Sequence, residues 1–138
     1  MATQQQQPVD VRTPIDDHDA IAATVQMYID GSAKGDAAML TEAFHPNAQM
    51  YGAVGADRYD EPIAEYVKLM AESPGGPMRG RITSIVQSGD AAGAIVEEDG
   101  FWGTLSFTTF LMLSRIDGRW RIVNKNFAHT GGEMPAAE

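Results

Sequence analysis

The C-terminal part of the chain contains four consecutive runs of β-branched and aromatic residues, and these most restrict the possible fold. From Arg81 onward the runs are RITSIVQSG, AAGAIVEED, FWGTLSFTTFLMLSRI and RWRIVNKNFAHT. Such composition predicts β-strands. Gly-Asp or Asp-Gly pairs separate the runs, and these pairs are typical of tight hairpin turns. The pattern therefore predicts a four-strand antiparallel meander.

A long helix is predicted near the N-terminus. Thr13 is a suitable cap and Pro14 a suitable first residue. Residues at spacings of three and four then define one buried stripe: Ile21, Val25, Tyr28, Ile29 and Ser32. Tyr28 is unusual there, because Leu or Ile would pack at least as well. Two interpretations of its hydroxyl stay open: a core group bonded to a backbone carbonyl, or a donor to a ligand.

Two shorter helices are predicted before the meander. Asp36 caps the second helix, and Pro46 stops it after His45. A brief strand, AQMYG, and a glycine-containing loop lead to Asp60, which caps the third helix. Three helices and a short strand followed by a meander predict an α+β fold, with the helices on one side of a bent sheet.

Composition and length predict one domain and exclude several kinds of partner. We expect residues 1–13 to form a disordered tail, residues 14–130 a single domain and residues 131–138 a frayed tail. The formal charge of −9 argues against nucleic acid and an anionic membrane as partners. The chain has no cysteine, so thiol chemistry is excluded. The first ten residues lack the pattern of a signal peptide, and a cytoplasmic location is expected.

The third strand of the meander suggests a second copy of the chain as a partner. LSFTTFLMLSRI is apolar on both faces, whereas an antiparallel strand with one solvated face alternates between apolar and polar residues. The helices cover only one face of the sheet. We therefore expect a homodimer through the other sheet face.

The element order, together with YIDGSAKGD, AFHPNAQMYG and LSRIDGRWRIVNK, resembles the nuclear transport factor 2-like superfamily. Within it the chain is most similar to the lumazine-binding branch, close to the polyketide-cyclase-like proteins. The resemblance covers residues 17–128. It implies a cone-shaped α+β barrel, in which three N-terminal helices pack on a strongly curved, mainly antiparallel sheet that encloses a pocket. It also implies a homodimer packed sheet to sheet.

The superfamily includes ketosteroid isomerase, scytalone dehydratase, limonene epoxide hydrolase and polyketide cyclases. Aligned by this resemblance, Tyr28 falls on the oxyanion-hole tyrosine of ketosteroid isomerase, but Gly52 falls on the general-base aspartate. A glycine cannot accept a proton. The resemblance therefore does not imply an intact isomerase mechanism or a steroid substrate.

The predicted catalytic residues are Tyr28, His45 and Glu97. Tyr28 would polarise a carbonyl oxygen, and His45, Glu97 or a bound water would move a proton. Structural interpretations stay open, because a histidine at a helix end stabilises the helix dipole and an acidic run is usually solvated. Strand alternation allows Glu97 or Glu98 to face inward, but not both.

The predicted ligand-binding residues are aromatic side chains and two amides: Tyr51, Tyr66, Trp102, Trp120, Asn124 and Asn126. On the last strand, alternation places Trp120, Asn124 and Asn126 on one face, which we expect to line the pocket. Lys125 and Phe127 would lie on the opposite face. The amides would orient a ligand or hold neighbouring loops.

The sequence therefore predicts a pocket for a small apolar or aromatic molecule. A cofactor-independent isomerase, dehydratase or cyclase that transfers protons on a carbonyl compound is the first hypothesis. A non-catalytic small-molecule binding protein and a dimeric interaction module with a filled cavity are the alternatives. No cofactor and no metal are expected, because the three histidines are far apart and form no ligand motif.

Overall fold

The computed structural model describes residues 12–134. Residues 1–11 and 135–138, which include most of the first predicted tail and half of the second, lie outside the described residues. Three helices and six strands follow one another in this order: α1 (Pro14–Lys34), α2 (Ala37–Ala43), β1 (Phe44–Val54), β2 (Asp57–Pro62), α3 (Ile63–Glu72), β3 (Arg79–Ser88), β4 (Ala91–Phe101), β5 (Leu105–Ile116) and β6 (Arg119–Gly131).

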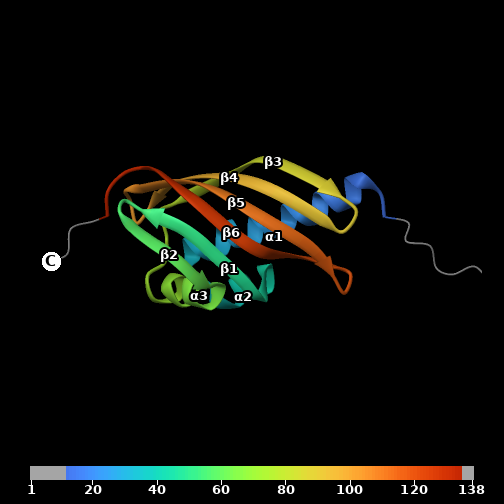
Figure 1. Ribbon diagram of the computed structural model, residues 1–138, viewed down its shortest axis with the longest axis horizontal. Coiled ribbons are helices and arrows are strands. Elements are labelled where there is room, and N and C mark those ends of the chain that lie inside the picture. Colours follow the sequence, from blue (N-terminus) through green and yellow to red (C-terminus); the bar gives the residue numbers. More distant parts are fainter. Residues whose placement is uncertain (1–11, 135–138) are drawn as a thin grey trace, which may run out of the picture.

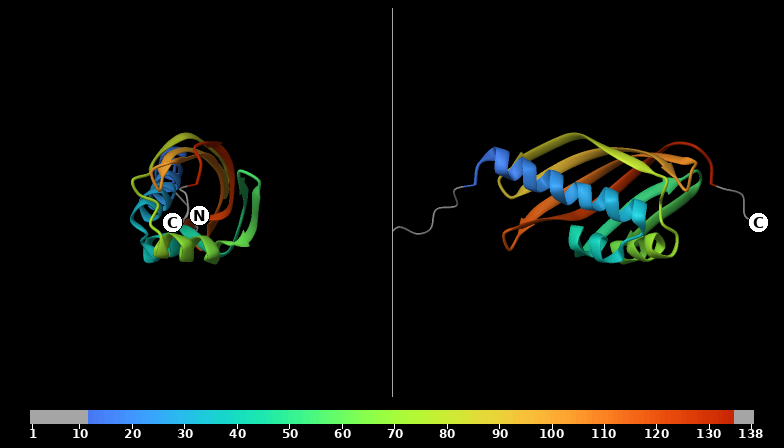
Figure 2. Two further views of the ribbon diagram at one scale, coloured as in Figure 1. Left: turned by 90° about the vertical axis from the view of Figure 1, so that its left-hand side faces the viewer. Right: turned by 180° about the vertical axis from the view of Figure 1, so that it is seen from behind.

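The strands form one sheet in the order β2-β1-β6-β5-β4-β3. All neighbours are antiparallel except β1 and β6, which run parallel. The sheet curves around α1, and α2 and α3 lie to one side of it (Figure 1; Figure 2, left). It is not closed, because β2 and β3 are its edges. The predicted fold class is thereby confirmed: an α+β fold with three helices on a curved, mainly antiparallel sheet.

The N-terminal half differs from the prediction around β1 and β2. Helix α2 ends at Ala43 rather than His45, because Phe44 already has an extended backbone and begins β1. The residue before a proline disfavours the helical conformation, so His45 belongs to the strand as well. Residues predicted as a loop and a helix cap form β2, which pairs with β1 across a turn at Gly55. Helix α3 then begins without a side-chain cap.

Helix α1 forms as its sequence predicts. Thr13 Oγ1 accepts a hydrogen bond from the Asp16 backbone N–H, and the Asp16 carboxylate accepts one from the Thr13 N–H. This reciprocal capping box stabilises the first turn. Gly35 ends the helix in the left-handed conformation at φ 68°. The predicted stripe is buried against the sheet, with Ile21, Val25 and Tyr28 fully inaccessible to solvent.

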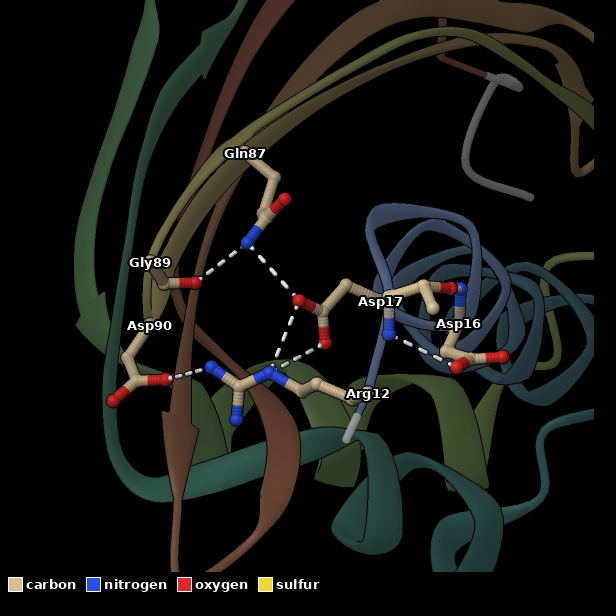
Figure 3. A network of polar contacts seen from close by, with 7 residues as sticks. Arg12, Asp16, Asp17, Gln87, Gly89 and Asp90 are labelled. Carbon is tan, nitrogen blue, oxygen red and sulfur yellow. Dashed lines mark hydrogen bonds and ion pairs between the residues drawn. The ribbon is translucent and has the colours of Figure 1, made fainter. Parts of the chain in front are cut away.

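A polar cluster fastens the start of α1 to the turn between β3 and β4 (Figure 3). Arg12 bonds the Asp17 carboxylate through Nε and the Asp90 carboxylate through a terminal nitrogen, the latter at 2.8 Å. Gln87 Nε2 donates to Asp17 and to the Gly89 carbonyl. Asp17 is buried, so these donors offset the cost of removing its charge from water.

In the part of the chain that the structure describes, no helix is long and apolar enough to cross a membrane.

A β-bulge at Val123 changes the orientation of the second half of β6. Ile122 pairs with Leu113 on β5 and Asn124 pairs with the adjacent Met112, so Val123 is an extra residue. Such an insertion reverses which faces the following side chains occupy. The prediction that Asn124 and Asn126 share a face with Trp120 is therefore wrong. Trp120, Ile122, Lys125 and Phe127 face the interior instead, and the two amides face outward.

Candidate functional site

A cavity of about 640 Å³ lies between the concave face of the sheet and α3. This volume is in the range of pockets for small organic ligands. Its wall is mainly apolar and is formed by α3, by strands β1, β2, β5 and β6, and by the end of β4 with the turn that follows it. The largest apolar side chains in the wall are Met50, Tyr59, Tyr66, Phe101, Trp102, Phe107 and Phe127. Glu61 and Glu65 also line it, and Glu65 is exposed where the cavity meets solvent.

One lysine lies in this apolar wall. Lys125 is 4% exposed and its Nζ lies 4.7, 4.8 and 5.3 Å from the ring centroids of Phe127, Tyr66 and Tyr28. Among residues 12–134, no side chain or carbonyl accepts a hydrogen bond from Nζ. Aromatic faces stabilise a cation only weakly, by about 0.5–2 kcal/mol each. The amine therefore has its hydrogen-bonding capacity free for a molecule in the cavity.

A buried carboxyl group lies beside this lysine but does not line the cavity. Glu98 accepts hydrogen bonds from the Tyr28 hydroxyl and the Thr109 hydroxyl, each at 2.6 Å. Distances this short are typical of hydroxyls that donate to a carboxylate. The Tyr66 hydroxyl forms a separate 2.6 Å hydrogen bond with Ser32 Oγ. The two donors to Glu98 thus fix its position behind the wall that Lys125 and Tyr66 form.

Burial shifts both charged groups toward their neutral forms. Desolvation lowers the pKa of Lys125 to about 8, and the nearby Glu98 charge opposes this shift. Desolvation likewise raises the pKa of Glu98, while Lys125 and the hydroxyls of Thr109 and Tyr28 oppose that shift. Desolvation also raises the pKa of Tyr28 and of Tyr66 well above the ordinary value for tyrosine, so both phenols stay neutral donors.

The three predicted catalytic residues do not meet at the cavity. The Tyr28 hydroxyl donates a hydrogen bond to the Glu98 side chain. The sequence left open a backbone carbonyl or a ligand as its partner, and the Glu98 carboxyl group is neither. Glu97 faces outward and accepts a hydrogen bond from Thr108, because alternation on β4 turns Glu98 inward instead. His45 is half-buried in β1, where its Nδ1 accepts the Asn47 backbone N–H. None of these three lines the cavity.

The predicted ligand-binding residues divide between two faces of the sheet. Tyr66 and Trp102 line the cavity, and Trp102 is anchored by a 2.9 Å hydrogen bond from Nε1 to the Ser73 carbonyl. Trp120 faces inward but does not line the cavity. The other three are on the outer face: Tyr51, Asn124 and Asn126.

The sequence contained partial signals for Glu98 and Lys125, the two buried charged residues that sequence reasoning did not assign to the site. Ala92, Ala94 and Val96 are the uniformly apolar alternating set of β4, which favours Glu98 as the inward residue. Phe127 is two positions after Lys125 and therefore lies on the same face of the strand. A large aromatic residue on that face was a sign that the face is interior. Only the bulge explains why that face is interior, and a bulge has no sequence signature in this strand.

Gly52 has a packing role that explains its residue type. It pairs with Phe127 across β1 and β6, and a Cβ atom there would lie 2.6 Å from the Phe127 ring. The ring thus occupies the space beside Gly52. The Phe127 ring therefore occupies the space beside the position that resemblance assigned to a general-base aspartate, and Lys125 is the cationic side chain among the described residues that line the cavity.

Comparison with known proteins gives a relative with a named activity. The aldolase FrzH of Cladobotryum sp. is 29% identical over 112 residues, which cover 80% of this chain and 90% of FrzH. Among solved structures, a nuclear transport factor 2-like protein from Methylobacillus flagellatus KT is 30% identical, with a TM-score of 0.79 and coverage of 87% of this chain and 97% of that chain.

A ketosteroid isomerase-like protein from Erwinia carotovora atroseptica shares the fold, at 17% identity and a TM-score of 0.66 over 80% of this chain and 94% of that chain. The model of a family described as "Putative lumazine-binding" matches residues 16–128, nearly the span over which the sequence motifs resemble it. The protein therefore belongs to this lumazine-binding family, within the nuclear transport factor 2-like superfamily.

Proposed function

We propose that the protein is a cofactor-independent enzyme that binds a small carbonyl compound in the cavity and promotes proton transfer at the carbon next to the carbonyl group. The observation that carries the proposal is Lys125, a buried amine without a hydrogen-bond acceptor among the described residues, in an otherwise mainly apolar wall. Burying an amine in such a wall is costly for stability. A reactive role explains its presence.

Polarisation of a carbonyl oxygen makes the neighbouring C–H bond acidic. A charged donor in a water-poor site stabilises the resulting enolate far more than the same donor does in water. Lys125 takes, in this proposal, the role expected of Tyr28, whose hydroxyl already donates to Glu98. Glu98 is a positioning residue, because it lies beside Lys125 and does not line the cavity.

The charges of the cavity wall restrict the class of ligand. Glu61 and Glu65 line the cavity, and the chain carries a net charge of −9. Both features repel anions. The aromatic side chains favour a flat apolar body, so the proposed substrate is a neutral or amine-bearing aldehyde or ketone with an aromatic or alicyclic part.

The relatives support this reaction class. FrzH is named an aldolase, and aldol reactions proceed through the same activated carbon next to a carbonyl group as isomerisations. A ketosteroid isomerase-like protein shares the fold, although at that identity the likeness concerns the fold alone. The proposed enzyme is accordingly a lyase or an isomerase.

A non-catalytic binding protein is the second candidate. Glu98 and Tyr28 do not line the cavity, and the carboxyl groups that do line it are Glu61 and Glu65. A binder would use Lys125 only to hydrogen-bond a ligand oxygen. The same cavity and the same ligand class serve both functions.

Deuterium incorporation tests the enzyme proposal. 4-Phenylbutan-2-one, a neutral aromatic ketone, is incubated with the protein in D₂O, and NMR measures exchange next to the carbonyl group. We expect the wild-type rate to exceed the Lys125→Met rate at least tenfold, and Lys68→Met, a change of an exposed lysine on α3, to match wild type.

Binding is measured separately through Trp102, with Trp120→Phe removing the other tryptophan. If the ketone quenches Trp102 fluorescence but its deuterium exchange is no faster than in buffer alone, the enzyme proposal is overturned and the protein is a binding protein.

A homodimer through the outer sheet face is also proposed. Val86, Gly93, Met112 and Asn124 form one row across this face, and Ile95, Phe110, Asn126 and Tyr51 form the next. Val86, Phe110 and Met112 are 69%, 44% and 52% exposed. A broad apolar face of this kind suits a two-fold contact with its own copy, in which the two amides can bond across the interface.

A further inference from the structure

We propose that Lys125 acts as a covalent nucleophile, and that its amine condenses with the carbonyl group of a bound aldehyde or ketone to form a protonated Schiff base. The inference rests on the proposed function and deepens it, because it states how Lys125 activates the substrate. A non-covalent ammonium donor and a Schiff base both promote proton transfer, but they leave different chemical traces.

The position of Nζ supports attack on a carbonyl carbon. The aliphatic part of Lys125 is held in the strand, and Nζ lies among the faces of three rings without a hydrogen-bond acceptor among the described residues. A nucleophilic amine must have a free lone pair and access to the ligand. Lys125 lines the cavity, so a carbonyl group in the cavity can reach it.

The protonation state agrees with this geometry. With the pKa of Lys125 lowered to about 8 by desolvation, about a tenth of the side chains are neutral at pH 7. An ordinary lysine, with a pKa near 10.5, would be neutral in about one molecule in three thousand. Lowering the pKa by burial in an apolar pocket is one of the ways in which enzymes activate a Schiff-base lysine.

The surroundings also accept the product. A protonated Schiff base carries one positive charge on the same nitrogen, as the resting ammonium does. The rings of Tyr28, Tyr66 and Phe127 face that nitrogen, and Glu98 provides a nearby carboxyl group. The reaction therefore creates no new kind of charge in the apolar wall.

The step is balanced without a cofactor. The Nζ lone pair forms a C–N bond as the carbonyl π pair moves to oxygen, and one proton passes from nitrogen to that oxygen. A second proton from solvent allows the hydroxyl to leave as water, which gives the protonated C=N bond. Loss of a proton from the adjacent carbon to water yields an enamine, and hydrolysis returns the ketone and the free amine.

Reductive trapping tests the covalent bond. The protein is incubated with 4-phenylbutan-2-one and sodium borohydride, and peptide mass spectrometry locates the reduced adduct. The chain has only three lysines, and Lys34 and Lys68 are exposed internal controls. We expect modification of Lys125 to exceed that of either control at least tenfold. Modification spread evenly over the three lysines, or absent from Lys125, would overturn the inference.

Exchange of the carbonyl oxygen separates the covalent from the non-covalent mechanism. Each Schiff base that forms releases the ketone oxygen as water, so the wild type in ¹⁸O-water should label the ketone at least tenfold faster than Lys125→Arg, which keeps a cation but is not a nucleophile. Circular dichroism checks that the variant is folded, and Lys68→Arg should behave as wild type.

Deuterium exchange that depends on Lys125 without ¹⁸O labelling would overturn the Schiff base and leave the proposed function intact. If the ketone binds near Trp102 but shows neither deuterium exchange nor ¹⁸O labelling above the rate in buffer, both the Schiff base and the proposed function are overturned.

Discussion

Lys125 and Glu98 show that burial shifts the protonation equilibrium of a side chain when its neighbours only partly offset the loss of hydration. Removing an ammonium group from water costs several kcal/mol. Each of the three aromatic faces stabilises the cation by about 0.5–2 kcal/mol, and the Glu98 carboxyl group stabilises it further. Desolvation remains the larger effect, because the pKa of Lys125 is lowered. The lysine is therefore better explained by reactivity than by stability.

This pKa predicts how stability depends on pH. Between pH 8 and 10.5 the unfolded chain holds a proton on Lys125 that the folded protein has released. The free energy of unfolding then rises with pH, by on the order of 3 kcal/mol over the full interval. Lys125→Met should lack this rise. Urea unfolding of both proteins from pH 7 to pH 10 measures the difference, and parallel profiles would contradict the lowered pKa.

At the scale of elements, the sequence predicted what depends on local pattern. Helix α1, its Thr13 cap and the Gly35 end follow from spacing and capping chemistry, and the meander follows from its turns. The strand β2 was missed, because DRYD is equally typical of a loop or a helix start. Its strand conformation comes from pairing with β1.

The site was less predictable because one extra residue in β6 decides it. Alternation correctly placed Trp120 inward, but the bulge at Val123 exchanged the roles expected of Asn124 and Lys125. A one-residue shift turns every later side chain to the opposite face. Sequence periodicity alone cannot locate such a shift. Tyr66 and Trp102 do line the cavity, because neither depends on the register of β6.

At the scale of the whole molecule, the sheet is curved and has a concave and a convex surface (Figure 2). The concave face and α3 enclose the cavity, whereas the convex face presents exposed Phe110 and Met112. Strand β5 contributes to both, because Leu111 and Leu113 are buried on the concave side. Its two apolar faces, noted from the sequence, thus belong to the core and to the proposed dimer interface.

The dimer proposal predicts a mass of twice the 14.9-kDa chain. Met112→Lys places a charge in the outer apolar face, and we expect it to weaken association at least tenfold, because an unpaired charge in an interface is costly. Thr41→Lys adds the same charge at an exposed position of α2 and should leave association unchanged. Sedimentation equilibrium measures both. A monomeric wild type, or equal effects of the two variants, would contradict the interface.

The dependence of the catalysed rate on pH tests the central claim of the covalent mechanism, that Lys125 acts on the carbonyl group through its free amine rather than as an ammonium donor. Deuterium exchange of 4-phenylbutan-2-one is measured from pH 6 to pH 10 for wild type, and the Lys125→Met rate is subtracted as background. Because the neutral amine is the active form, the difference should rise with pH to a plateau, with a midpoint near the Lys125 pKa of about 8. A difference that is zero throughout, or that falls as pH rises through 8, would contradict it.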